Sequence, residues 1–437
     1  MASTNKAHVV IIGGGFGGLY AAKTLGNKPV RVTLIDKKNH HTFQPLLYQV
    51  ATAGLSPGEI AAPIRGVLGR YKNTEVLLGD VIGVDTTRNV VQFARNEATG
   101  DPGDPGELAF DYLIIATGAS HNYFGHDDWA RYAPGLKTIE DATEIRRRIL
   151  LAFELAERRA RVTGTQEPIN FVIVGGGPTG VELAGTTIEI ARRVLNQQFR
   201  SIDPARARVI LVEAGPRVLP PYPEDLSQSA ERQLRHLGVE VMTNSMVTDI
   251  GPDHVMIGTT RLPAAVALWS AGVQASPLGK RLGVPVDRAG RVIVESDLTI
   301  PGHRNIFVVG DLAAAKSPDG KPVPGVSPAA IQMGRFAAHT ILGDLKGKPR
   351  GQFSYWDKGS LATIGRAAAV ADFGKIHLSG FIAWLAWLFI HVFFLIGFKN
   401  RLLVLIDWAW AYVTFQRGAR LITGNSDAIA PSQRSTT

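Results

Sequence analysis

Short apolar runs alternate with stretches of helical character along this chain, and two of these runs open onto a glycine-rich turn. The run His8–Ile12 is followed by Gly13–Gly18, and the run Ile169–Val174 is followed by Gly175–Gly180. A predicted helix comes directly after each turn. A buried strand, a turn and a helix form the repeating unit of parallel α/β sheets. The pattern therefore predicts an α/β fold with two domains of similar construction.

The first turn has the spacing G-x-G-x-x-G. Gly13 permits a tight turn, Gly15 lets a pyrophosphate approach the backbone, and Gly18 lets the next helix pack against the strand. The following strand ends at Asp36, where a carboxylate can accept hydrogen bonds from ribose hydroxyls. Strand, turn, helix and acid together predict a dinucleotide-binding site.

The second turn repeats this spacing at Gly175, Gly177 and Gly180, and the strand after it ends at Glu213. This acid comes late because the intervening helix is expected to continue to about Arg200. A Glu at this strand end accepts from a free 2′-hydroxyl and repels a 2′-phosphate. We therefore expect NADH rather than NADPH in this domain, although tolerance of NADPH is left open.

Each half of the chain also contains a later apolar strand that is followed by small residues. Tyr112–Ile115 leads into Ala116–Gly118, and Ala265–Trp269 leads into Ser270–Gly272. Small residues at a carboxyl strand end let the backbone approach a ligand at the mouth of the sheet. Thr117, Gly118 and Gly272 are therefore candidate cofactor contacts.

A third strand end adds an acid to the first domain. Asn305–Val309 is followed by Asp311 and then by a predicted helix over Pro328–Leu342. An Asp here could bind the hydroxyls of a ribityl chain, and the positive end of the helix would stabilise a reduced flavin. This strand joins the first sheet only if the second domain is an insertion.

Two dinucleotide sites with different acids predict FAD in the first and NAD in the second. We expect two Rossmann-like domains, with the NAD domain inserted in a discontinuous FAD domain, plus a C-terminal membrane-associating region. The expected boundaries are 1–140 and 281–350 for FAD, 141–280 for NADH and 351–437 for the C-terminal region.

The composition narrows the chemistry further. The chain has no cysteine, which excludes disulfides, a thiol nucleophile and a cysteine-held metal centre, and we predict no metal site. Lys and Arg outnumber Asp and Glu by 47 to 38, so the net charge is +9. A basic chain favours anionic surfaces, and we expect an anionic lipid surface rather than nucleic acid as the partner.

One stretch after Asp36 narrows the family. His40–Thr52, HHTFQPLLYQVAT, resembles the corresponding segment of type II NADH dehydrogenases, the non-proton-pumping NADH:quinone oxidoreductases of the two-dinucleotide-binding-domain flavoprotein superfamily. The resemblance extends from about residue 8 to 415. It implies noncovalent FAD, hydride donation by NADH and electron removal by a membrane quinone. His40 and His41 are interpreted as loop residues that support the flavin site rather than as proton carriers.

The resemblance also implies roles for the residues that match the family pattern. The expected FAD contacts are Gly13, Gly15, Gly18, Asp36, Thr117, Gly118 and Asp311. The expected NADH contacts are Gly175, Gly177, Gly180 and Glu213, and Gly272 remains a candidate from its place at a strand end.

Two further residues are carried over as catalytic candidates. Glu182 matches a family glutamate near the meeting point of nicotinamide, flavin and quinone, and could relay protons to the reduced quinone. The alternative is that a Glu in the first turn of a helix only complements the helix dipole. Of the two glutamines in a family A-Q-x-A-x-Q pattern, this chain keeps the second, Gln332, and has Pro328 in place of the first. The quinone pocket is therefore expected to differ in detail.

The C-terminal region contains an 18-residue apolar run, Phe381–Phe398, in which His391 is the sole strongly polar side chain. A second apolar run, Leu402–Phe415, follows it. Basic residues and tryptophans beside apolar runs are typical of an interfacial anchor. Those found here are Trp384, Trp387, Trp408, Trp410, Lys399, Arg401, Arg417 and Arg420.

Three interpretations of this region compete: a buried core helix, a single transmembrane helix, and helices that lie in one leaflet. We favour the last, because two helices in one leaflet could cover the mouth of a quinone tunnel while the basic residues meet anionic headgroups. The expected location is the cytoplasmic face of the cell inner membrane, with peripheral or monotopic attachment.

Two other functions remain alternatives. One is a soluble NADH-dependent reductase of a redox protein, and the other is a flavin-binding signalling protein of the apoptosis-inducing-factor type. Disulfide reductases and sulfide:quinone reductases of this fold are excluded, since both require cysteines. The identity of the quinone and the existence of a homodimer are left open.

Overall fold

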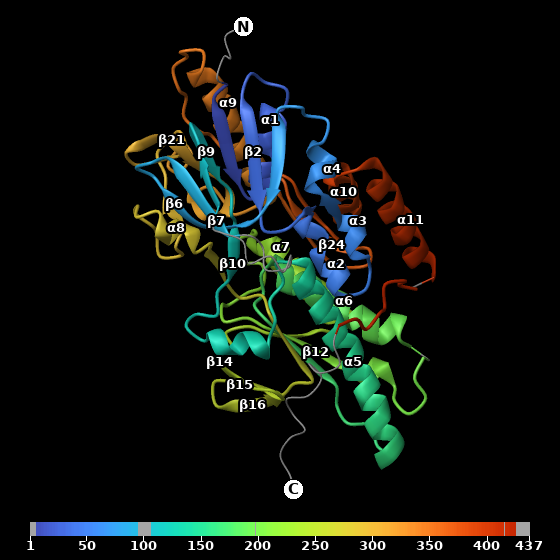
Figure 1. Ribbon diagram of the computed structural model, residues 1–437. Helices are drawn as coiled ribbons and strands as arrows, with labels where there is room; N and C mark the ends of the chain where they lie inside the picture. Colours follow the sequence, from blue (N-terminus) through green and yellow to red (C-terminus); the bar gives the residue numbers. More distant parts are fainter. Residues whose placement is uncertain (1–5, 95–105, 197, 415, 425–437) are drawn as a thin grey trace. The chain divides into compact units, whose positions relative to one another are not determined.

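The computed structural model describes residues 6–94, 106–196, 198–414 and 416–424 (Figure 1). The chain divides into two compact units, each assembled from three segments. The first unit comprises Met1–His41, Ala61–Ser120 and Val273–Lys358, and the second comprises Thr42–Ile60, His121–Gly272 and Gly359–Thr437.

The first unit is built on a six-stranded sheet with the order β20-β21-β9-β1-β2-β5. Strand β1 is buried along its whole length and pairs in parallel with β2 and β9. Strand β21 pairs in parallel with β9, so the segment after the insertion does return to the first sheet. The bounds are β1 (His8–Ile12), β2 (Arg31–Asp36), β5 (Thr74–Leu78), β9 (Tyr112–Ile115), β20 (Thr299–Ile300) and β21 (His303–Val308).

Two helices of the first unit, α1 (Phe16–Leu25) and α9 (Ser327–Asp344), lie side by side (Figure 1). They approach so closely that a Cβ on Gly334 would overlap the carbonyl oxygen of Gly17. A small antiparallel sheet, β6 (Asp80–Asp85), β7 (Val90–Ala94) and β8 (Gly106–Ala109), belongs to the same unit. Its shorter elements are β4 (Ala61–Pro63), α4 (Ile64–Leu68), β18 (Val273–Ala275), α8 (Leu278–Arg281), β19 (Val292–Ile293) and β22 (Ala313–Ala314).

The second unit repeats the construction with a four-stranded parallel sheet of order β13-β12-β11-β17. An antiparallel sheet of β14, β15 and β16 extends it. The strands are β11 (Asn170–Val174), β12 (Arg208–Val212), β13 (Glu240–Met242), β14 (Val247–Ile250), β15 (His254–Ile257), β16 (Thr260–Pro263) and β17 (Val266–Trp269). The helices are α2 (Leu47–Ala51), α3 (Pro57–Ile60), α5 (Ile139–Thr163), α6 (Pro178–Glu189) and α7 (Glu224–Leu237). The short strands β3 (His40–Thr42) and β10 (Ala119–His121) include residues of both units.

The helix after the second glycine-rich turn is shorter than predicted. Helix α6 begins at Pro178, continues as a π-helical turn over Ile190–Val194, and does not reach Arg200. The carboxylate of Glu157 accepts hydrogen bonds from the backbone N–H groups of Arg200, Ser201 and Ile202, at 2.9–3.2 Å. These bonds hold the chain in a loop, because the same N–H groups cannot also bond within a helix.

The C-terminal segment packs into the second unit rather than forming a separate region. Strands β23 (Ser360–Gly365), β24 (Ala368–Asp372) and β25 (His377–Ser379) form an antiparallel sheet beside α6. A Cβ on Gly185 of α6 would overlap the carbonyl oxygen of Ile364, so helix and strand meet without an intervening side chain. The compact units divide after residues 41, 60, 120, 272 and 358.

The 18-residue apolar run does not form one helix. Helix α10 (Gly380–Phe394) ends before Leu395, which is extended, and Gly397 has a φ of 92°. Helix α11 (Phe398–Thr414) then begins, and Phe415 lies outside the described residues. Within the described ranges, no helix combines the length and the apolar character that a membrane crossing requires.

Candidate functional site

The glycines of the first turn have two different tasks. A Cβ on Gly13, whose φ is 100°, would overlap the carbonyl oxygen of Ala116, and one on Gly18 would overlap the carbonyl oxygen of Gly13. A Cβ on Gly15, in contrast, would meet no atom within 4 Å. Gly13 and Gly18 therefore serve close packing, whereas Gly15 leaves open space at the N-terminus of α1.

Asp36 is tied to this turn by its carboxylate. The N–H of Gly14 donates to Oδ2 at 2.5 Å, and the N–H of Lys38 donates to Oδ1 at 2.7 Å. Burial raises the pKa of Asp36, and the two N–H donors oppose that effect. The acid expected to bind a ribose thus also fixes the shape of the glycine-rich turn.

The second turn shows the same glycine packing and the same kind of carboxylate bond as the first. A Cβ on Gly180 would overlap the carbonyl oxygen of Gly175, while one on Gly177 would again meet nothing within 4 Å. The N–H of Gly176 donates to Oε2 of Glu213 at 2.6 Å. Each unit therefore presents one open glycine at a helix N-terminus and one carboxylate bonded to the turn.

The candidate strand-end residues divide between open space and packing. Gly118 has a φ of 67° and open space at its Cβ position, and the buried hydroxyl of its neighbour Thr117 has no hydrogen-bond partner among the described residues. Asp311 follows Gly310, whose φ is 71°. Gly272 packs instead, because a Cβ there would lie 2.8 Å from the carbonyl oxygen of Asn122.

The first unit therefore fits a dinucleotide that carries a flavin. Its open positions at Gly15 and Gly118 would admit the pyrophosphate backbone. The unpartnered Thr117 hydroxyl and the Asp36 carboxylate offer hydrogen-bonding groups to it.

His41 supports this turn rather than carrying protons. Its Nδ1 lies 2.9 Å from the carbonyl oxygen of Gly14, and its ring meets that of Phe16 edge-on at 4.9 Å. Burial lowers the pKa of His41 to about 4, so the ring is neutral at pH 7.

A cavity of about 80 Å³ lies in the second unit. Its lining comes from the segment that contains α2, from the chain just before α5 and from the first residues of α6. The lining residues are Gln44, Leu47, Tyr48, Leu136, Lys137, Thr179 and Glu182. Motif spacing does not bring Tyr48 and Glu182 together, because they lie 134 positions apart in the chain.

Glu182 lines this cavity from α6. Because α6 begins at Pro178, Glu182 is the fifth helical residue and lies beyond the first turn. Burial raises the pKa of Glu182 well above its ordinary value, although a backbone hydrogen bond from Thr363 opposes the shift. A carboxyl beyond the first turn gains little from the helix dipole, which weakens the purely structural interpretation.

Tyr48 faces the same cavity and is 3% exposed. Its hydroxyl accepts a hydrogen bond from Nε2 of Gln49 at 2.9 Å, and Oε1 of Gln49 accepts one from the indole N–H of Trp408 at 2.7 Å. Sequence reasoning used this segment for its resemblance and assigned no role to Tyr48 or Gln49.

Gln332 lies in the first unit, where its amide is engaged by backbone. Its Nε2 donates to the carbonyl oxygen of Trp356 at 2.9 Å, and the N–H of Trp356 donates to its Oε1 at 3.0 Å. These two bonds fasten the segment around Trp356 to α9. A contact with quinone stays a prediction for this residue.

Three polar contacts hold α11 and the chain after it in the second unit. Trp408 bonds to Gln49, as described above. Asp407 hydrogen bonds to Glu59 of α3, and burial together with this partner raises the pKa of Glu59 to about 7. Arg417, which is 12% exposed, pairs with Oε2 of Glu189 at 2.8 Å and donates to the carbonyl oxygen of Thr52 at 2.9 Å.

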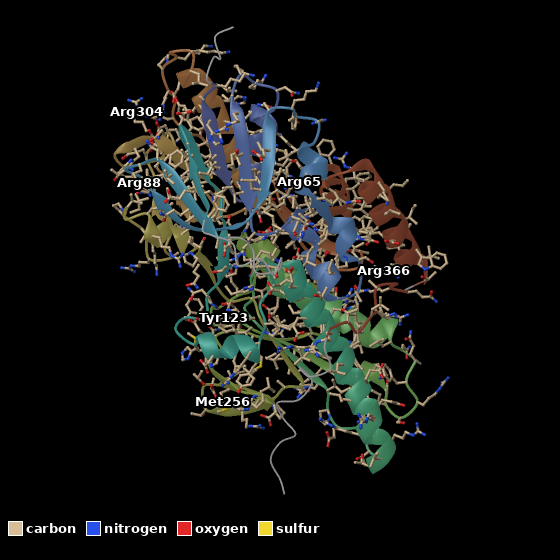
Figure 2. The ribbon with its side chains drawn as sticks, in the orientation of Figure 1. Arg65, Arg88, Tyr123, Met256, Arg304 and Arg366 are labelled. Carbon is tan, nitrogen blue, oxygen red and sulfur yellow. The ribbon has the colours of Figure 1, made fainter. Side chains whose placement is uncertain are left out.

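Two basic residues that were expected to meet lipid headgroups, Arg417 and Arg420, have partners within the protein. Arg417 is buried in its ion pair, and Arg420 donates to Oε1 of Gln198. Arg366, labelled in Figure 2, lies with its guanidinium 3.9 Å above the ring centre of Tyr412 on α11. Some basic side chains in this part of the chain thus stabilise the packing of α11, while others face solvent.

The tryptophans also divide between packing and exposure. Trp387 is buried and packs against Trp408, with ring centres 5.2 Å apart, while Trp410 is exposed. His391 bonds to the carbonyl oxygen of Trp387, and burial lowers its pKa to about 4.

The remaining face of α10 and α11 carries large apolar side chains that are exposed, which excludes a fully buried core helix. We call these residues the apolar face: Phe381, Ile382, Phe389, Phe393, Leu402, Leu403, Leu405, Ile406, Trp410 and Val413. Contiguous exposed apolar surface of this kind marks a site of contact with a membrane or another molecule.

Comparison with known proteins agrees with this geometry. Residues 7–334 match the pyridine nucleotide-disulphide oxidoreductase family, and residues 357–416 match the NDH2 C-terminal domain. A type II NADH:quinone oxidoreductase of Mycobacterium tuberculosis, Ndh, is 47% identical over 96% of this chain and 90% of its own length. A type II NADH:quinone oxidoreductase of Haemophilus influenzae is 31% identical over 84% of this chain and 88% of its own.

The fold has a solved counterpart in NDH2 from Plasmodium falciparum in complex with NADH. It superposes with a TM-score of 0.84 at 20% identity and covers 96% of this chain and 100% of that one. Sequence and fold agree over nearly the whole length, and the chain therefore belongs to the type II NADH:quinone oxidoreductases of the pyridine nucleotide-disulphide oxidoreductase family.

Proposed function

We propose that this chain oxidises NADH through bound FAD and reduces a membrane quinone by two electrons, without pumping protons. The observation that carries the proposal is the duplicated turn, in which Gly15 and Gly177 each leave open space beside a carboxylate bonded to the turn. Two dinucleotides, one in each unit, are what a transfer from NADH to FAD requires.

Within this proposal, each unit's residues bind and orient one dinucleotide. Gly15, Thr117 and Gly118 admit and bind the FAD pyrophosphate, Asp36 its ribose and Asp311 its ribityl chain. Bound FAD supplies a two-electron acceptor for hydride and a donor to the quinone. Gly177 admits the NADH pyrophosphate, and Glu213 selects a free 2′-hydroxyl by hydrogen bonding and charge.

An anaerobic two-step mixing experiment tests the function. Purified protein mixed with NADH should lose its yellow colour, and a decyl-chain benzoquinone added next should restore the colour rapidly. A soluble reductase or a signalling flavoprotein would bleach but would recover slowly with quinone. Bleaching that quinone cannot reverse, or a preparation that never retains flavin, contradicts the proposal.

Replacement of Gly15 by Ala should separate folding from FAD binding. The new Cβ meets no protein atom but occupies the space left for the pyrophosphate, so the FAD-free variant should melt at the temperature of the FAD-free wild type. Its FAD content after purification should fall at least tenfold, as measured by absorbance of released flavin. The matched control is Gly66→Ala in α4. The nearest atom to its new Cβ would be Cβ of Pro63, at 3.9 Å. Equal FAD content in the two variants would oppose this assignment.

We also propose that Glu182 donates a proton during quinone reduction. Because burial raises its pKa, the carboxyl stays protonated above its ordinary range and can act as a general acid. The rate of flavin reoxidation should then fall as the pH rises through this raised pKa.

Glu182→Gln should slow flavin reoxidation about 100-fold. It should also remove the fall in reoxidation rate that is expected as the pH rises. Stopped-flow reoxidation by quinone between pH 5 and 9 measures both effects. Glu154→Gln, at an exposed position of α5, is the control and should keep the wild-type profile. A Glu182→Gln profile that coincides with the wild type would remove the assignment.

For location, we propose that the apolar face lies in one leaflet at the cytoplasmic face of the cell inner membrane. Exposed apolar side chains on two adjacent helices, exposed Lys399 and the net charge of +9 favour an anionic leaflet. His391 is neutral at pH 7, so the described part of α10 carries no charge into the lipid.

Polar substitution on the apolar face should weaken vesicle binding. Phe389 and Phe393 are 70% and 68% exposed, and burying one such side chain contributes about 1.5–3 kcal/mol. The double variant Phe389→Ser/Phe393→Ser should bind vesicles containing phosphatidylglycerol at least tenfold more weakly in a sedimentation assay. Val162→Ser, at an 86% exposed position of α5, should bind like the wild type. Unchanged binding of the double variant would argue against this docking surface.

A further inference from the structure

The hydroxyl of Tyr48 has a proton to donate and no described acceptor for it. Tyr48 is almost completely buried yet lines the cavity, and its oxygen accepts from Gln49. Among the residues that the structure describes, no oxygen or nitrogen accepts a hydrogen bond from this hydroxyl. A buried O–H without an acceptor is costly, because it has lost its bond to water.

The orientation of Gln49 determines where that proton points. An indole N–H can only donate, so the atom of Gln49 that faces Trp408 must be the amide oxygen. The amide nitrogen then faces Tyr48 and donates to its oxygen. The Tyr48 oxygen is thus an acceptor on the Gln49 side, and its own hydrogen is directed elsewhere, with the cavity as the neighbouring open space.

Glu182, which also lines the cavity, does not take this proton. Its proximity raises the pKa of Tyr48 further, after the larger effect of burial, but the two side chains form no hydrogen bond. Tyr48 therefore remains protonated at pH 7, with its hydrogen available to a ligand in the cavity.

We propose that the Tyr48 hydroxyl donates a hydrogen bond to the carbonyl oxygen of the quinone during its reduction, and that Gln49 and Trp408 are the positioning residues that aim it. This inference rests on the proposed function. The quinone gains two electrons and two protons to become the quinol. The two electrons and one proton originate from NADH as hydride, the second proton comes from Glu182, which regains it from solvent, and Tyr48 keeps its own proton throughout. Its role is to stabilise negative charge on the quinone oxygen as electrons arrive.

A carbonyl oxygen could also come from the carboxamide of nicotinamide. The quinone is favoured because Trp408, which fixes the whole chain of hydrogen bonds, lies on α11. The neighbouring residues Leu405 and Ile406 belong to the apolar face, from which a lipid-soluble acceptor would come. Half-reactions measured separately distinguish the two sources.

The test uses Tyr48→Phe in the full-length, FAD-loaded protein. Anaerobic stopped-flow first follows flavin bleaching by NADH and then reoxidation by the decyl-chain benzoquinone. Bleaching should stay within twofold of the wild type, whereas reoxidation should slow about 10- to 100-fold, since a hydrogen bond to a developing charge is lost. Tyr71→Phe, which removes a phenol that does not line the cavity, should leave both steps unchanged.

A second variant, Trp408→Phe, keeps an aromatic ring but removes the indole N–H. Gln49 can then turn over, so reoxidation should slow by a smaller factor, about 3- to 10-fold, with bleaching unchanged. The double variant Tyr48→Phe/Trp408→Phe should be no slower than Tyr48→Phe alone, because Trp408 acts through Tyr48. An effect that merely reflected packing would add in the double variant. FAD content and melting temperature are measured for each protein.

Each outcome decides one point. If wild-type protein is bleached but not recoloured by quinone, the proposed function fails. If the wild type is recoloured and Tyr48→Phe reoxidises at the same rate, this inference alone is overturned. If Tyr48→Phe slows bleaching instead, the hydroxyl serves nicotinamide, which also overturns it. Should Tyr48→Phe fail to fold, an unchanged reoxidation rate in Trp408→Phe would refute the positioning chain.

Discussion

The second unit depends on a contact in which backbone meets backbone. Gly185 of α6 lies against the carbonyl oxygen of Ile364 in β23, and any larger residue would separate helix from strand. This contact joins the C-terminal segment to the helix that carries Glu182 near its beginning and Glu189 at its end. The ion pair between Glu189 and Arg417 then fastens the chain beyond α11 to the same helix. The cavity and the apolar face are thus parts of one packed unit.

Burial shifts the pKa values of three side chains in that unit toward their neutral forms. Burial raises the pKa values of Tyr48 and Glu182 and lowers that of His391, so each of these side chains avoids charge where water is scarce. Protonated oxygens in a cavity are suited to an acceptor that arrives uncharged and leaves with two added protons. Glu189 and Arg417, which carry opposite charges, form an ion pair in the same unit.

The glycine-rich turns show how far a sequence pattern can be followed. Both strands, both turns and the acids Asp36 and Glu213 lie where the spacing predicts, because close packing at Gly13, Gly18, Gly175 and Gly180 tolerates no side chain. The end of α6 was predicted wrongly, since the sequence near Arg200 gave no sign that Glu157, on a distant helix, would bind three backbone N–H groups there. Local sequence patterns predict structure that neighbouring residues determine. This loop is instead stabilised by Glu157, which lies 43 residues before Arg200 in the chain.

The sequence by itself determined the fold class, the two glycine-rich turns with their acids, the inserted order of the domains and the apolar character of the C-terminal helices. These features follow from periodicity and from glycine geometry, which are local in the chain. The tertiary structure alone decided that Arg417 is buried rather than facing lipid, that Gln332 bonds to the backbone of Trp356, and that Tyr48 shares a cavity with Glu182. Such pairings join distant segments, because each polar group, once buried, must find a partner that the packing of the whole unit supplies.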